Sequence, residues 1–219
     1  MSELPEIKGN AELKLPDHLV PQYPEHWELF SMPGPYDDGY LTKEDIEMVY
    51  NTTWTISHNA ARGGIRLIGP KPKWARSDGG EGGAHPSNVI EYGYPIGTLN
   101  WTGDDPCLFP LDCPDFGGFV SSTTIVKAEF WRLGQMKAGN KLKFCRVSLD
   151  DAIAKRREVE EFVSMIEACC RGNSSFEDAS PLEYRLAAVS EIPEHGLGYH
   201  SPDPREGQPT TRVLQAGRR

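Results

Sequence analysis

The feature that most constrains this chain is a series of short β-branched and aromatic runs between Thr53 and Val147. Glycine or proline interrupts the series roughly every ten residues, which is the spacing of successive short strands. The runs are Trp54–Ser57, Ile65–Ile68, Asn88–Tyr92, Ile96–Leu99, Thr123–Val126 and Lys143–Val147. Regularly spaced strands of this kind are typical of a compact barrel or sandwich. We therefore expect a mainly β fold.

Helices are predicted at three places around the β region. Thr42 and Asp45 have the spacing of a capping box and should open a short helix. A second capping box begins at Ser148 and should open a longer helix, from Asp150 to about Cys170. Apolar residues recur along this second helix at steps of three and four, which predicts an amphipathic helix: Ile153, Val159, Phe162, Val163 and Ile166. One helical turn is expected over 127–135.

The two ends of the chain differ in composition from the centre. We predict an extended lead-in over 1–22, the β-barrel region over 23–149 and the amphipathic helix over 150–170. Glycine, proline, serine and charged residues dominate 171–219. Such a segment buries too little apolar surface to offset its ordering entropy, so we expect a flexible linker or a disordered tail.

Charge and cysteine content exclude several classes of protein. The 219 residues include 23 basic and 32 acidic side chains, for a net charge of -9, which argues against a nucleic-acid or anionic-membrane surface. No apolar run approaches the roughly 18 residues that span a bilayer, and the start does not resemble a signal peptide, so we expect a cytoplasmic protein. Five cysteines without C-x-x-C spacing indicate reduced thiols and predict no metal site.

Two polar segments are weaker candidates for a site. The glycine-rich run from Gly79 to His85 lacks the Gly-Lys-Ser/Thr ending of a phosphate loop, so we favour a plain hairpin or lid over a ligand-facing loop. His58 and His85 lack further ligands at metal spacing and are interpreted as ordinary loop or strand histidines. A basic cluster is interpreted as a solvated face, with an anion site as the alternative: Lys127, Arg132, Lys137, Lys141 and Lys143.

The strongest candidate is the acidic region from Asn100 to Phe119. Asp104 and Asp105 are consecutive and precede a proline, so one can cap a turn while the other binds a ligand or acts as a base. Asp115 is followed by Gly117 and Gly118, which lack a Cβ and let the backbone approach a ligand closely.

Four motifs in this order resemble one protein family. They are Asn59–Lys71, Gly79–Gly93, the two aspartate segments and Leu133–Phe144. Together they resemble the carboxyltransferase region of fungal urea carboxylase, found in urea amidolyase, and more broadly the KipA-type proteins, also called allophanate hydrolase subunit 2. The resemblance implies a cyclophilin-like β-barrel and transfer of a carboxyl group from carboxybiotin to urea, giving allophanate.

The resemblance also implies roles and partners. Asp104 or Asp105 would hold urea N–H groups or take the proton, while Asn100, Asp115 and the amides near Gly117 would position substrate or oxyanion. Biotin would be delivered by a carrier domain and ATP used elsewhere in the whole enzyme, and this chain alone would bind no cofactor. The second wall of the site would come from a KipI-like half. The stretch 212–217 resembles the opening of such a KipI-like unit.

Two functions from different classes remain open at this point. One is a subdomain or fragment of the carboxylase, inactive alone because only one wall of the site is encoded. The other is a non-catalytic, KipA-like binding or regulatory module that pairs with a KipI-like partner.

Overall fold

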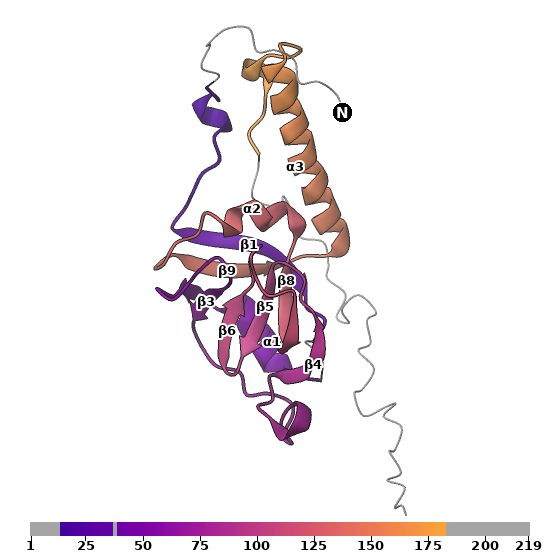
Figure 1. The fold of residues 1–219 in the computed structure, drawn as a ribbon. Helices are drawn as coiled ribbons and strands as arrows, with labels where there is room; N and C mark the ends of the chain where they lie inside the picture. The colour runs from indigo at the N-terminus through magenta and orange to yellow at the C-terminus, as the bar shows by residue number, and fades with distance from the viewer. Residues whose placement is uncertain (1–13, 37–38, 183–219) are drawn as a thin grey trace, which may run out of the picture.

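A closed barrel of seven strands forms the centre of the molecule (Figure 1). The computed structural model describes residues 14–36 and 39–182. Around the barrel the strands follow the order β1 (His26–Pro33), β8 (Ser121–Ile125), β5 (Thr98–Thr102), β6 (Asp105–Leu108), β3 (Ile65–Ile68), β2 (Trp54–Ile56) and β9 (Lys141–Arg146). Two further strands, β4 (Asn88–Gly93) and β7 (Phe116–Phe119), form a separate two-stranded sheet. The predicted mainly β barrel is confirmed.

Within the described residues three helices accompany the barrel: α1 (Lys43–Asn51), α2 (Phe130–Leu133) and α3 (Leu149–Cys170). Both predicted capping boxes are confirmed, because Thr42 Oγ1 accepts from the amide of Asp45 at 3.1 Å and Ser148 Oγ accepts from that of Asp151 at 3.1 Å. Short 3-10 turns complete the structure: η1 (Asp17–Leu19), η2 (Glu81–Gly83), η3 (Lys127–Glu129) and η4 (Phe176–Asp178). Among the described residues no helix is long and apolar enough to cross a membrane.

The barrel closes through strands that lie far apart in the sequence. β1 pairs antiparallel with β8 on one side and parallel with β9 on the other, in a register that joins His26 to Lys141 and Ser31 to Arg146. β9 also pairs antiparallel with β2. β9, the last barrel strand in the sequence, therefore pairs with the first two, β1 and β2.

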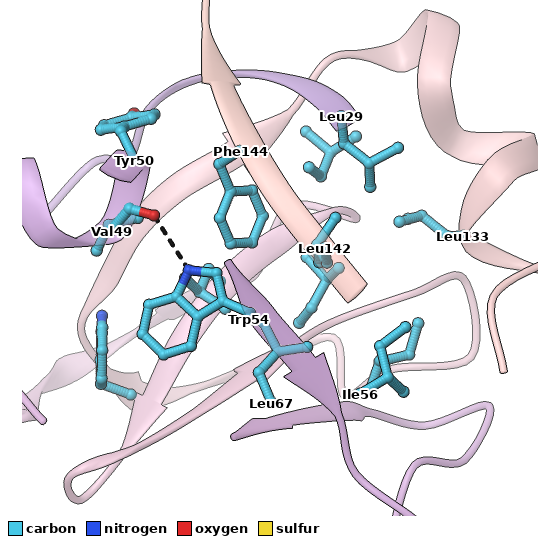
Figure 2. Packing of buried hydrophobic residues seen from close by; sticks show 14 of the residues in the cluster. Leu29, Val49, Tyr50, Trp54, Ile56, Leu67, Leu133, Leu142 and Phe144 are labelled. Atoms are coloured by element: carbon cyan, nitrogen blue, oxygen red, sulfur yellow. Dashed lines mark hydrogen bonds between the residues drawn. The ribbon is translucent and has the colours of Figure 1, made fainter. Parts of the chain in front are cut away.

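The barrel interior is filled by large side chains (Figure 2). Trp54 is completely buried and donates its indole N–H to the carbonyl of Val49 in α1 at 3.1 Å, which ties that helix to the core. Its ring meets that of Trp101 edge to face, with centroids 6.2 Å apart. Around these rings lie buried aliphatic and aromatic side chains that include Leu29, Ile56, Leu67, Leu142 and Phe144. Each such side chain contributes about 1.5–3 kcal/mol of burial free energy.

Three local features differ from the sequence-based expectations. β6 and β7 lie in the acidic region, where no strand was predicted. α3 extends away from the barrel in Figure 1, and two residues of its predicted apolar stripe, Ile153 and Val163, are 40% and 58% exposed. Arg132 of the predicted solvated basic face is buried, because it pairs with Glu129 and lies over the ring of Trp27.

The predicted lead-in and tail lie partly outside the described residues. Residues 14–22 contain the turn η1, whose Leu19 is buried. Residues 171–182 contain η4, and Ala179 beyond it is also buried. The predicted segment boundaries at 22, 149 and 170 stay predictions.

Candidate functional site

Asp104 occupies the tip of the hairpin between β5 and β6. Thr102 pairs with Asp105, so Gly103 and Asp104 form a two-residue turn. Gly103 has a φ of +76°, which the first position of such hairpin turns requires and which glycine adopts without a Cβ clash. The amide of Gly103 donates to Ser87 Oγ at 3.2 Å and fixes the turn against the segment before β4.

Donors from two other segments surround the Asp104 carboxylate. Oδ1 accepts the indole N–H of Trp74 at 3.0 Å and lies 3.3 Å from His85 Nε2, while Oδ2 lies 3.9 Å from Lys71 Nζ. The side chain is 38% exposed, and Oδ2 accepts no hydrogen bond from the residues that the structure describes. Among the described residues Asp104 Oδ2 has the Lys71 ammonium beside it at ion-pair distance and can still accept a hydrogen bond from a ligand.

The hydrogen bonds of His85 define which ring nitrogen carries its proton. The amide of Ser87 donates to His85 Nδ1 at 3.2 Å, so Nδ1 acts as an acceptor and the neutral ring carries its proton on Nε2, facing Asp104. Ser87 Oγ lies 3.0 Å from Nδ1, which completes a serine–histidine–aspartate order. Ser87 is completely buried, however, so its hydroxyl cannot attack a substrate and serves instead to orient the imidazole.

A row of aromatic rings connects this site to the core. Trp74 meets His85 edge to face at 5.5 Å and meets Trp101 in the same way at 6.0 Å. Trp101 in turn contacts Trp54. Edge-to-face contacts of this kind contribute about 0.5–1.5 kcal/mol each beyond burial. The Trp74 indole, which donates to Asp104, is therefore held in place by the packed rings of His85 and Trp101.

The neighbouring carboxylates have no such surroundings. Asp105 is exposed and starts β6, and its main-chain carbonyl accepts from Thr102 Oγ1 at 3.2 Å. Asp115 is also exposed, and its carbonyl accepts the amide of Tyr94 at 2.8 Å. Within 14–36 and 39–182, neither side chain makes a hydrogen bond or ion pair. The structure thus separates Asp104, which is held by partners, from two solvated carboxylates.

Asn100 lies inside the barrel, away from the surface that carries Asp104. It is completely buried, donates to Thr98 Oγ1 at 2.7 Å and accepts from Ser121 Oγ at 2.5 Å. Ser121 also contacts the hydroxyl of Tyr92, and burial raises the pKa of that phenol well above its usual range. These bonds give Asn100 a role in joining β5 to β8, and its predicted role in substrate binding stays a prediction.

Gly117 and Gly118 are explained by packing within the β4–β7 sheet. A Cβ on Gly117 would lie 2.6 Å from Tyr94 Oη, and one on Gly118 would lie 2.5 Å from the carbonyl oxygen of Val89. Tyr94 Oη also accepts the amide of Phe119 at 2.8 Å. Protein atoms therefore fill the space that these glycines leave, and close approach of a ligand there stays a prediction.

Sequence reasoning missed part of the surroundings of Asp104. Lys71 and Trp74 follow no periodic pattern, and nothing in the sequence indicates that Trp74 has a positive φ of 63°. His85 was interpreted as a satisfied loop or strand histidine, and its contact with Ser87 agrees with this, but its place beside Asp104 was not predicted. No group of three or more histidine, cysteine, aspartate or glutamate side chains in the described part of the chain could hold a metal ion.

Comparison with known proteins identifies the family of this chain. Residues 3–146 match the model of the carboxyltransferase domain, subdomain A and B. The chain belongs to this carboxyltransferase domain family. A protein of Emericella nidulans, named as a candidate urea carboxylase, is 58% identical over 218 residues, which are 99% of this chain and 17% of that protein. Urea amidolyase of Saccharomyces cerevisiae is 42% identical over 141 residues, which are 63% of this chain and 8% of that enzyme.

Solved structures of the carboxyltransferase family share the fold. Kluyveromyces lactis urea amidolyase matches with a TM-score of 0.63 and 36% identity, over 80% of this chain and 10% of that chain. Kluyveromyces lactis urea carboxylase matches equally well, over 81% of this chain and 15% of that chain. The present chain thus corresponds to a small part of much longer proteins, and within them to a carboxyltransferase region.

Proposed function

We propose that this chain forms part of the carboxyltransferase centre of a biotin-dependent urea carboxylase, which converts urea to allophanate. The observation that carries the proposal is the Asp104 carboxylate on a surface turn, whose Oδ1 is held by Trp74 and His85, while Oδ2 lies beside Lys71 and accepts no hydrogen bond from the described residues. Membership of the carboxyltransferase domain family and the relation to urea carboxylases and urea amidolyases support the choice of reaction and substrate.

The chemistry of urea explains why such a carboxylate is needed. A urea nitrogen is a weak nucleophile, and it must lose a proton as it forms a bond to the carbon of carbon dioxide. Asp104 Oδ2 can accept a urea N–H group, orient the nitrogen and take that proton as the N–C bond forms. Trp74 and His85 hold the other oxygen and keep the carboxylate in one orientation.

Biotin and the remaining parts of the enzyme are assigned to other domains. Bound biotin would supply the carboxyl group as carbon dioxide, and ATP would be consumed elsewhere. The side chains of Asp104, His85 and Lys71 are 38%, 39% and 66% exposed, so the described residues leave this site open to an incoming carrier. A KipI-like half would provide the opposite wall in a cytoplasmic enzyme. On this proposal the isolated chain has no carboxyltransferase activity.

Paired substitutions test which aspartate matters. The chain replaces its 218-residue equivalent in the Emericella nidulans protein, and urea-dependent allophanate formation is measured beside thermal melting. We expect Asp104→Asn to reduce the transfer rate by about 10²-fold or more, because the amide keeps the size and loses the charge and the proton acceptor. Asp105→Asn is the matched control, because this solvated neighbour has no partners in the described chain and its loss should leave the rate near wild type.

The transfer rates of these variants distinguish the roles of the two aspartates. A fall in rate for Asp105→Asn alone would restore the sequence-based alternative in which Asp104 caps the turn and Asp105 reacts. Near-native rates for both variants and for the double variant would contradict a catalytic carboxylate here and favour the non-catalytic binding module.

A further inference from the structure

One buried carboxylate reaches from helix α1 to the loop that carries Trp74. Asp45 is 3% exposed and is the third residue of α1. Its Oδ2 accepts the amide of Thr42 at 3.0 Å, as a capping box requires. The carboxylate also accepts two amides that a helix cap does not require: Oδ1 accepts that of Lys73 at 2.9 Å, and Oδ2 accepts that of Trp74 at 3.1 Å.

These two bonds hold a residue whose backbone conformation is unfavourable. Trp74 has a φ of +63°, a strained region that bulky side chains rarely adopt. Such a conformation persists only when its surroundings fix it. The amide bonds to Asp45 and the adjacent bond from Ala75 N to the carbonyl of Tyr40, 3.0 Å long, fix it from the backbone side.

The direction of the Trp74 side chain follows from that backbone. The indole N–H reaches Asp104 Oδ1 at 3.0 Å, while the ring packs between His85 and Trp101. A return of Trp74 to a negative φ would turn the indole away from Asp104. The two aspartates are therefore linked through one residue, although they lie 59 positions apart in the sequence.

We propose that Asp45 is a positioning residue for the Asp104 carboxylate and acts through the backbone of Trp74. Asp45 holds the loop, the loop sets the direction of the indole, and the indole holds Asp104 Oδ1, while Oδ2 lies beside Lys71. The consequence for carboxyl transfer rests on the proposed function. The structural link from Asp45 through Trp74 to Asp104 rests on the described contacts alone.

Two substitutions separate this role from that of a helix cap. Asp45→Glu keeps the charge and gives the glutamate that capping boxes commonly use, but the longer side chain moves its oxygens relative to the loop amides. Thr42→Ala does the reverse, because it removes the cap acceptor for the amide of Asp45 and leaves both loop bonds in place.

The measurement is solvent exchange of the Trp74 indole N–H in the 219-residue chain by NMR. Trp74→Phe identifies the resonance by its loss. We expect Asp45→Glu to speed indole exchange by about tenfold or more, together with exchange of the Lys73 and Trp74 amides, because bonds to a charged acceptor are lost. Thr42→Ala should leave all three rates within about twofold of the wild type, since local opening of the loop is unchanged.

Other results would overturn the inference. Wild-type exchange in Asp45→Glu would show that the carboxylate does not hold the loop, and equal acceleration in Thr42→Ala would show an effect of helix stability only. Should Asp45→Glu fail to fold, Asp45→Asn provides the same test, because it keeps the size and loses one acceptor oxygen.

Activity then tests the functional part separately. In the grafted carboxylase, Asp45→Glu should lower kcat for carboxyl transfer and Thr42→Ala should not. If Asp104→Asn has no effect on transfer, the proposed function fails while the exchange result stands. If Asp104→Asn is impaired and Asp45→Glu has normal kcat and normal exchange, the positioning role fails alone.

Discussion

At the scale of single residues, adjacent positions with the same side chain have different physical roles. Asp104 has two donors and a cation around it, whereas Asp105 meets solvent. The difference comes from residues 71–85, which are brought to the hairpin by the fold. The sequence predicted that one aspartate of this pair is structural and the other reactive, but it could not assign them, because no local pattern shows which residues will surround each carboxylate.

Gly117 offers a test of packing at this scale. Gly117→Ala places a Cβ 2.6 Å from Tyr94 Oη, and the ring cannot withdraw without losing its bond from the amide of Phe119. Overpacking of this kind costs about 1–3 kcal/mol, so we expect a lower free energy of unfolding by that amount in denaturant titration.

Gly134 provides the matched control for this substitution. It has a right-handed helical backbone, and the nearest atom to an added Cβ is 3.7 Å away, which is ordinary contact. Gly134→Ala should be neutral or stabilising by about 0.4–1 kcal/mol, because alanine restricts the unfolded chain. Equal destabilisation by both changes would contradict the packing account of Gly117.

At the scale of elements, a buried charge pair attaches the η3–α2 turn to the barrel. Arg132 pairs with Glu129, donates to the carbonyl of Glu28 in β1 at 2.8 Å and lies over the ring of Trp27. Burial raises the pKa of Glu129 above its ordinary value of 4.5, and the Arg132 guanidinium opposes that shift only in part. The attachment of this turn should therefore depend on pH.

The sign of this dependence follows from proton binding. Above pH 4.5 the unfolded state loses the Glu129 proton first, while the folded state keeps it up to its higher pKa. The unfolded state then binds fewer protons, so the contribution of Glu129 to the free energy of unfolding falls as pH rises through this window.

We expect Glu129→Gln to lack this fall. The unfolding free energy of the wild type minus that of the variant should decrease from pH 4.5 upward and become constant above the raised pKa. Denaturant unfolding at a series of pH values measures it, with the exposed Glu161→Gln as control. A flat difference for Glu129→Gln, or the same slope for the control, would argue against burial as the cause.

Elements defined by local chemistry could be predicted, and elements defined by a distant partner could not. The capping boxes at Thr42 and Ser148 are local hydrogen-bond patterns, so the starts of both helices were predicted within a residue or two. β6 and β7 lack the alternation of β-branched residues that marks a strand, and Pro106 and Gly117 read as turn residues. They are strands because β6 pairs with β5 and β3, and β7 pairs with β4.

At the scale of the whole molecule, β9 completes the barrel and should decide whether it folds. It pairs with both β1 and β2, so a chain of residues 1–140 leaves two open edges and an uncovered core. We expect this truncation to give no dispersed NMR spectrum and no cooperative melting transition, whereas a chain of residues 1–182 keeps both. Cooperative melting of the shorter chain would show that six strands are a stable unit.

The barrel architecture was predictable as a class because strand spacing alone indicates it, and the resemblance to the carboxyltransferase family added the closed form. The parallel β1–β9 pairing was not predictable. It joins residues more than a hundred positions apart, and the apolar patterns of both strands fit either direction equally well.

The parallel direction of β1 and β9 also determines where the chain enters and leaves the barrel. The chain enters at His26 and leaves at Arg146, which pairs with Ser31, so entry and exit lie on opposite rims. Five strand residues at roughly 3.3 Å each separate the two points by about 17 Å. An antiparallel closure would bring both connections to one rim. The parallel closure instead places the full height of the strand pair between the incoming and the outgoing chain.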